Sequence, residues 1–155
     1  MLLQLGSMKR PLALYILCVL LLILSANALF AGFLMITGIQ AAGIGMSVSE
    51  LRNTPFNSYL IPGLLLFSFN GVFPLFTLIG LVAKPKWGWP NIINLYKDKH
   101  WAWAYSIYVG VITITWILVQ ITIIQFSILQ PIVAGIGLLI LVLTLLPRIM
   151  RHYTL

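Results

Sequence analysis

The side chains that could do chemistry inside the apolar stretches of this sequence are neutral amides, hydroxyls and one tryptophan. Asn70, Thr113, Trp116 and Gln120 each stand within a run of Leu, Ile, Val or Phe. Thr113 and Gln120 are seven residues apart, so a helix places them on one face. These groups form hydrogen bonds but carry no charge. They predict either hydrogen bonding between helices or a polar-lined pocket for a neutral ligand, and both alternatives stay open.

Residues that support catalysis or metal binding are scarce. His100 and His152 flank apolar runs, Asp98 is the one acid close to a histidine, and Glu50 stands apart. The sequence has no pair of histidines at helical spacing, no nucleophile elbow and no glycine-rich phosphate loop. Cys18 is the single cysteine, which excludes an intramolecular disulfide and a cysteine-based metal site. We therefore predict no catalytic residue, no metal and no cofactor.

The composition of the chain indicates the environment in which these polar groups lie. The chain has 155 residues, of which 61% are hydrophobic and only 7% are charged, whereas soluble domains carry about 25% charged residues. A chain this poor in charge could not cover a water-facing surface, so its solvent must be lipid. The net charge of +7 comes from basic residues that flank apolar segments rather than form a stripe, which predicts membrane topology and no nucleic-acid partner.

Four apolar stretches are long enough to cross a bilayer core of about 30 Å. They cover approximately residues 11–37, 59–83, 101–126 and 129–150. The last two are separated by only a few residues and predict an antiparallel hairpin. Pro74, four residues after Asn70, should kink the second stretch. The expected fold is all-α: one integral membrane domain, residues 1–155, forming an antiparallel four-helix transmembrane bundle.

Basic residues give this bundle an orientation. Eight of the nine Lys and Arg residues lie before the first span, between the second and third, or at and after the end of the fourth, and Arg52 is the exception. The positive side of a membrane protein is cytoplasmic, so we predict a multi-pass protein of the cell membrane with both termini cytoplasmic. Lys9, Arg10 and the following "SANA" resemble a signal peptide, but the apolar run continues past it, which favours an uncleaved span.

Tryptophan and lysine crowd around the predicted cytoplasmic loop. Both side chains favour the headgroup region of a membrane. We interpret them as lipid-interface anchors, and recognition of anionic lipid is the alternative. The anchor residues are Trp87, Trp89, Trp101, Trp103, Lys84 and Lys86.

The segment between the first two spans predicts an ordered cap. Ser47 and Glu50 have the spacing of a capping box, which predicts a short extracytoplasmic helix over about 48–53, ended by Pro55. A re-entrant ligand-binding loop is the alternative.

Beneath this cap we expect the polar side chains in the outer half of the bundle to point inward, because unpaired amides in hydrocarbon cost several kcal/mol, and these side chains are the candidate ligand-binding residues. Asn27 of the first span lies at a depth similar to that of Asn70, so the two amides can meet if the spans are neighbours. The residues of the expected region are Asn70, Trp116 and Gln120, pointing inward, with Tyr59 and Gln130 as its roof.

Four segments of the sequence resemble a known group of proteins. "TPFNSYLIPGLLL", "WAWAYSIYVGV", "WILVQITII" and "LQPIVAGIGLLILVLTLLP" are similar to a widespread family of small, uncharacterised four-span integral membrane proteins of bacteria and archaea. The resemblance covers nearly the whole chain and implies the fold and membrane location only. It also implies that Trp116 and Gln120 belong together.

Three classes of function follow from these observations. The first is a non-enzymatic bundle that binds a membrane-protein partner or forms a homo-oligomer, favoured by small residues on helix faces and by the lack of charge within the spans. The second is a binder or carrier of a lipid or another neutral hydrophobic molecule. The third is a membrane enzyme acting on lipid, which would need Glu50, Asp98 or His100.

Overall fold

Every regular element that the structure describes is helical. The computed structural model describes residues 9–38, 52, 54–123 and 127–155. Three helical stretches, Leu12–Thr37, Leu60–Ala83 and Trp101–Thr122, are long and apolar enough to cross a membrane. The elements are α1 (Leu12–Thr37), α2 (Leu60–Leu65), the π-helix η4 (Leu66–Val72), α3 (Phe73–Ala83), the 3₁₀-helix η5 (Trp89–Ile92), α4 (Trp101–Ile123), α5 (Leu129–Thr144) and α6 (Pro147–His152).

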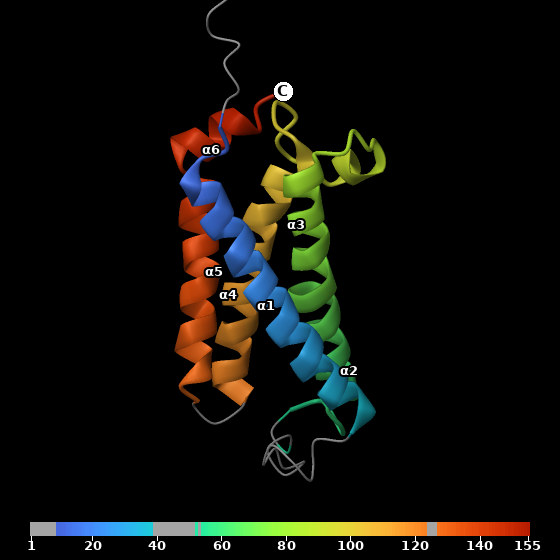
Figure 1. Ribbon diagram of the computed structural model, residues 1–155. Helices are drawn as coiled ribbons and strands as arrows, with labels where there is room; N and C mark the ends of the chain where they lie inside the picture. Colours follow the sequence, from blue (N-terminus) through green and yellow to red (C-terminus); the bar gives the residue numbers. More distant parts are fainter. Residues whose placement is uncertain (1–8, 39–51, 53, 124–126) are drawn as a thin grey trace, which may run out of the picture.

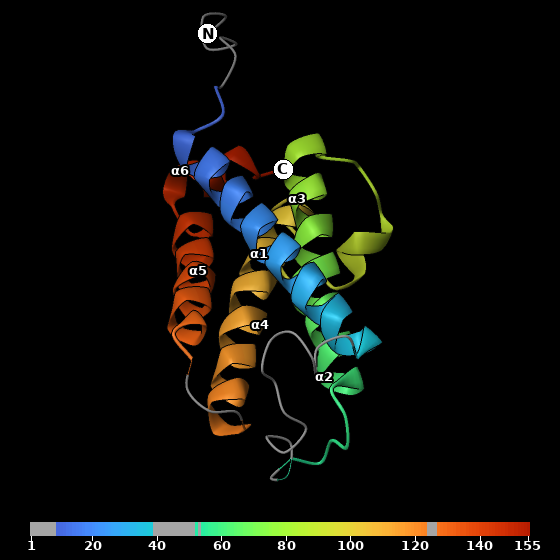
Figure 2. The same cartoon turned by 60° about the horizontal axis from the view of Figure 1, so that its bottom comes forward.

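The long helices pack side by side, with α1 crossing the others diagonally. α1 contacts α5 near its own start and α2 and η4 toward its end, while α4 contacts both α3 and α5 (Figures 1 and 2). The start of α1 and the C-terminus of the chain lie at the same end of the molecule, which we call the terminal end (Figure 1). The segment 84–100, which includes η5, extends sideways there (Figures 1 and 2).

The second long stretch is one continuous rod in which the central part is π-helical. α2, η4 and α3 follow one another without a break, and the Phe73 N–H donates to the Ser68 carbonyl five residues earlier. Pro74 has no N–H and its ring clashes with the carbonyl four residues earlier in a regular α-helix. A wider π turn before Pro74 relieves that clash. The distortion expected from Pro74 therefore takes the form of η4.

The last predicted stretch is divided in two. α5 ends at Thr144, and Leu146 has an extended backbone with ψ of 134° before α6 begins at Pro147. The residue before a proline avoids the helical region, which explains the break. The prediction of one continuous helix over 129–150 was therefore wrong. The sixteen residues of α5 span about 24 Å, less than a full bilayer core.

Close approach between α1 and the second rod depends on glycine. A Cβ atom on Gly32 would stand 2.8 Å from the Cβ of Phe67 and 2.9 Å from its backbone nitrogen. A Cβ on Gly63 would stand 2.7 Å from the Cβ of Met35. Small residues permit such contacts between apolar helices. α1 ends at Thr37, where Gly38 adopts a left-handed conformation with φ of 68°.

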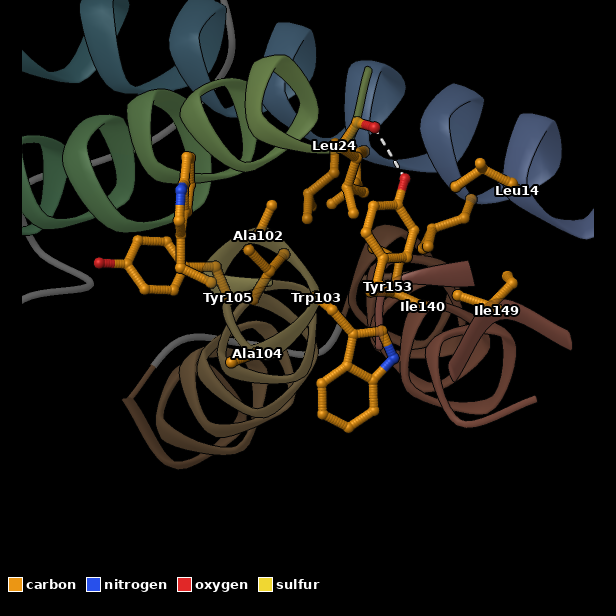
Figure 3. Close-up of a cluster of buried hydrophobic side chains, with 14 residues drawn as sticks. Leu14, Leu24, Ala102, Trp103, Ala104, Tyr105, Ile140, Ile149 and Tyr153 are labelled. Atoms are coloured by element: carbon orange, nitrogen blue, oxygen red, sulfur yellow. Dashed lines mark hydrogen bonds between the residues drawn. The ribbon is translucent and has the colours of Figure 1, made fainter. Parts of the chain in front are cut away.

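The hydrophobic core is concentrated toward the terminal end. Tyr153 stands in the middle of it, between α1, α3 and α5, and its hydroxyl donates to the Leu81 carbonyl at 2.7 Å (Figure 3). The small residues Ala102 and Ser106 of α4 are fully buried, and Gly110 lies against Leu141 and Gly137 of α5. This small-residue face of α4 is therefore a helix contact.

Candidate functional site: a buried amide between η4 and α4

Asn70 lies in the π-helix and is held from two sides. Ser25 of α1 donates its hydroxyl to the Gly71 carbonyl at 2.7 Å, next to Asn70 in the chain. Thr113 of α4 donates its hydroxyl to Asn70 Oδ1 at 2.9 Å. Both hydrogen bonds are buried. η4 is therefore fixed between α1 and α4, with the Asn70 carboxamide directed at α4.

One half of the Asn70 amide is unpaired. Asn70 is 2% exposed, and its Nδ2 has no hydrogen-bond partner among the described residues. Its Oδ1 already accepts from Thr113, so the free group is a donor of two hydrogens. A buried donor without a partner costs about 1–3 kcal/mol, which calls for an explanation in a native fold.

A second unpaired donor lies one turn along α4. Trp116 follows Thr113 by three residues, so the two side chains are neighbours on the helix surface. The Trp116 Nε1 atom is buried and, in the part of the chain that is described, has no partner. Gln120 is half-buried one further turn along, and its side chain forms no hydrogen bond with the described residues. The two unpaired groups, Asn70 Nδ2 and Trp116 Nε1, are uncharged hydrogen-bond donors.

The two expected roof residues are both buried. Tyr59 is buried against Met35 of α1. The Gln130 side chain is buried, and its Oε1 accepts the Ser127 N–H at 3.3 Å at the start of α5. Apart from residue 52, the predicted helix over 48–53 lies outside the described residues.

Asn27 does not meet Asn70. The Asn27 side chain is exposed on α1, and Ser25, two residues earlier, makes the contact to η4 instead. The register of α1 explains the difference, because residues two apart on a helix point in different directions. The expected pairing of the two amides was therefore wrong.

The four tryptophans of the predicted interface divide into two pairs. Trp101 and Trp103 are 1% and 2% exposed, and their indole N–H groups donate to the Pro85 and Thr144 carbonyls at 3.3 and 2.9 Å. They are core residues, and their side chains are not exposed to lipid. Trp87 and Trp89 are 42% and 61% exposed and stack on each other with centroids 6.2 Å apart.

An aromatic cluster fixes the segment 84–100 against α3 and α4. The Phe76 ring lies 5.4 Å from Trp89 and 5.0 Å from Trp101, measured between centroids. Tyr105 and Tyr108 of α4 donate their hydroxyls to the Pro90 and Ile93 carbonyls. These contacts hold the segment that carries the exposed Trp87 and Trp89 in place. Lys86 is exposed beside them, whereas Lys84 is half-buried and donates to the His152 carbonyl at 3.1 Å.

The candidate acid and base groups have structural partners. His100 Nδ1 accepts the Ala102 N–H at 3.3 Å and Nε2 lies 3.0 Å from the Pro85 carbonyl, so the neutral ring caps α4. Burial lowers the pKa of His100, and the Lys84 charge lowers it further. The hydrogen bond from Lys99 lowers the pKa of Asp98. Glu50 lies outside the described residues, and the rest hold no group of three His, Cys, Asp or Glu side chains suited to a metal.

Sequence reasoning did not single out Ser25 or Tyr153. Ser25 could have been identified, because it shares the buried face of α1 with the small residues Ala28 and Gly32. Tyr153 follows the last apolar run and resembles an interface residue, so nothing in its local pattern indicates a buried position.

Comparison with models of protein families, with curated proteins and with solved structures found no match to this chain.

Proposed function

We propose that this chain is a multi-pass protein of the cell membrane in which α1, the α2–η4–α3 rod, α4 and α5 form an antiparallel four-helix bundle. Three helical stretches long enough to span and the apolar side chains exposed along the bundle support this proposal. The concentration of Lys and Arg at the terminal end supports cytoplasmic termini. On this orientation, the Asn70–Trp116 region faces the outer half of the membrane. The resemblance to four-span bacterial and archaeal proteins remains a prediction.

We propose further that this region binds a neutral hydrophobic molecule and that the protein has no catalytic activity. The observation that carries this proposal is the pair of buried, unpaired donors, Asn70 Nδ2 and Trp116 Nε1. Two donors without an acceptor select a ligand that supplies acceptor oxygen, and an ester or ketone carbonyl has two lone pairs for them. π-helical turns occur frequently at functional sites, which agrees with the position of Asn70 in η4.

The ligand class follows from the surroundings. The spans hold no charged residue near Asn70 or Trp116, so a charged headgroup would be buried without a partner. The neighbouring side chains are apolar or aromatic, which suits acyl or prenyl chains. An acyl lipid supplies such acceptors in its ester carbonyls.

Native mass spectrometry of the full chain from its own membrane tests the proposal. We expect one lipid per chain for the wild type and loss of that lipid in Asn70→Leu and Trp116→Phe. Asn27→Leu makes the same chemical change on the exposed face of α1, so it should retain the lipid. Equal lipid retention by all four proteins would contradict the proposal and leave the two donors to buried water.

A second function, self-association, is supported by Asn27. This amide is exposed near the middle of α1, flanked by the exposed side chains of Ile23 and Phe30. A carboxamide directed at hydrocarbon is unfavourable, and it both donates and accepts hydrogen bonds. In a twofold dimer about the membrane normal, Asn27 of each copy lies at the same depth, so the two amides can pair. We therefore propose a second copy of this chain as the occupant of this face.

The dimer has a test independent of ligand binding. Interhelical amide hydrogen bonds are worth about 0.6–2 kcal/mol, so Asn27→Leu should weaken dimerisation by about 3–30-fold. Asn70→Leu should leave dimerisation unchanged. Dissociation constants from energy transfer between labelled copies in bilayers measure both. A monomeric wild type, or an Asn27→Leu dimer of unchanged affinity, would contradict self-association through α1.

A further inference from the structure

Basic side chains converge at the terminal end, where three elements meet. Arg10 precedes α1, Lys84 ends α3, and His152 ends α6. Arg10 Nη2 donates to the Val82 carbonyl at 3.0 Å, two residues before Lys84. Lys84 Nζ donates to the His152 carbonyl at 3.1 Å and lies 4.5 Å from the centre of the Tyr153 ring. We call Arg10, Lys84 and His152 the cationic junction, in which Arg10 and Lys84 carry the positive charge, because burial lowers the pKa of His152.

No acid neutralises this junction among the described residues. Asp98 is the one described carboxylate side chain, and it pairs with Lys99 at 3.0 Å. The Arg10 charge lowers the pKa of both Lys84 and His152, after burial as the larger cause, so the groups lie close enough to repel one another. Like charges held together without a counter-ion are unfavourable unless an anion joins them.

The junction keeps unused donors. Arg10 and Lys84 each use one N–H on a helix carbonyl, and the guanidinium and ammonium groups have five and three donors. The buried His152 Nε2 has no partner in the described part of the chain. Lys84 is also the one described non-glycine residue with positive φ, at 47°. A strained backbone that places a lysine at a site is a pointer to function.

We propose that the cationic junction binds a phosphate group. Its donors come from three elements, and phosphate oxygens accept charge-assisted hydrogen bonds from several cations at once. The junction lies where α1 begins and α3 ends, which is headgroup depth in the proposed membrane orientation (Figure 1). An anionic lipid headgroup and a free phosphate share this chemistry. The lipid source rests on the proposed membrane location, whereas the binding of phosphate by the junction does not.

Lys84→Gly is the informative variant. Glycine adopts the positive φ of position 84 without strain, so the variant removes the ammonium group while keeping the end of α3. Lys97→Gln is the matched control, because Lys97 belongs to the same segment and donates to the Asn91 carbonyl outside the junction. We expect Lys84→Gly to bind phosphatidylglycerol about tenfold more weakly than the wild type, and Lys97→Gln to bind it equally well.

Two arms identify the phosphate source. Full-length protein is titrated with phosphatidylglycerol in phosphatidylcholine nanodiscs, and separately with inorganic phosphate in uncharged detergent. Saturable, Lys84-dependent binding in the nanodisc titration alone shows that the ligand is a lipid headgroup. Saturable, Lys84-dependent binding of inorganic phosphate shows that the ligand is free phosphate. Binding lost equally in Lys84→Gly and Lys97→Gln, or no binding in either arm, overturns the proposal. In the wild type, the His152 NMR titration must also move to higher pH with the ligand; an unmoved titration contradicts the proposal without reference to a variant.

Discussion

At the scale of single residues, Trp103 is the clearest case of an interface-type side chain used inside the protein. Its indole N–H donates to the Thr144 carbonyl at 2.9 Å, and Tyr96 packs edge-on against its ring at 5.1 Å. Trp103→Phe removes the donor and leaves a small cavity, so we expect the free energy of unfolding to fall by about 1–3 kcal/mol. Reversible unfolding in detergent measures this. Trp89→Phe, on an exposed ring, should change it by no more than about 0.5 kcal/mol.

The two histidines predict how stability depends on pH. Burial lowers the pKa of His100 and of His152 below the usual value of about 6.5, and Lys84 lowers both further, with Arg10 also acting on His152. The unfolded chain therefore takes up protons first as the pH falls. Stability should be constant above about pH 7 and decrease as the pH falls through 6.5 and below.

Unfolding midpoints in uncharged detergent across this range check the prediction. His100→Asn keeps a capping residue at the start of α4, and combined with His152→Asn it should flatten the profile. A profile that is equally steep in the double variant would place the titrating groups elsewhere.

At the scale of elements, glycine contacts set the distance between helices. Gly32 of α1 approaches Phe67 so closely that a Cβ atom must move the backbone. Gly135 of α5 has nothing within 4 Å of the position of a Cβ atom. We expect Gly32→Ala to destabilise the fold by about 1–3 kcal/mol and Gly135→Ala to stabilise it by up to about 1 kcal/mol. Equal effects of the two substitutions would contradict the close α1–η4 contact.

Helix position was predictable from the sequence, and helix register was not. Apolar length alone located α1, the α2–η4–α3 rod and α4, because crossing hydrocarbon requires continuous helix. The break before Pro147 was available from the rule for residues that precede proline, but the apolar run concealed it. Which face of α1 turns inward depends on contacts with other helices, so Ser25 rather than Asn27 reached η4.

The sequence predicted which polar side chains are buried at the candidate site, but not which residues they contact. Asn70 is buried, as the cost of an amide in hydrocarbon requires, but its partner Thr113 follows from the packing of η4 on α4. Trp101 and Trp103 have the same residue types and spacing as interface anchors. Only the fold of the segment 84–100 back onto α4 separates them from the exposed Trp87 and Trp89.

At the scale of the whole molecule, the proposed orientation places the two ends of the bundle on opposite sides of a membrane. Ser58 and Lys97 are both exposed, before α2 and before α4 respectively. In a Cys18→Ala background, Ser58→Cys should react with an impermeant thiol reagent in intact cells, and Lys97→Cys only after the membrane is opened. Labelling of both positions from one side would contradict the orientation.

Native mass spectrometry of the wild type beside Asn70→Leu and Asn27→Leu shows whether the unpaired donors of Asn70 and Trp116 bind a neutral lipid. We expect one lipid per chain in the wild type and in Asn27→Leu, and none in Asn70→Leu. A wild-type chain that carries no bound molecule, or an Asn70→Leu chain that keeps the same lipid, would contradict lipid binding by these donors.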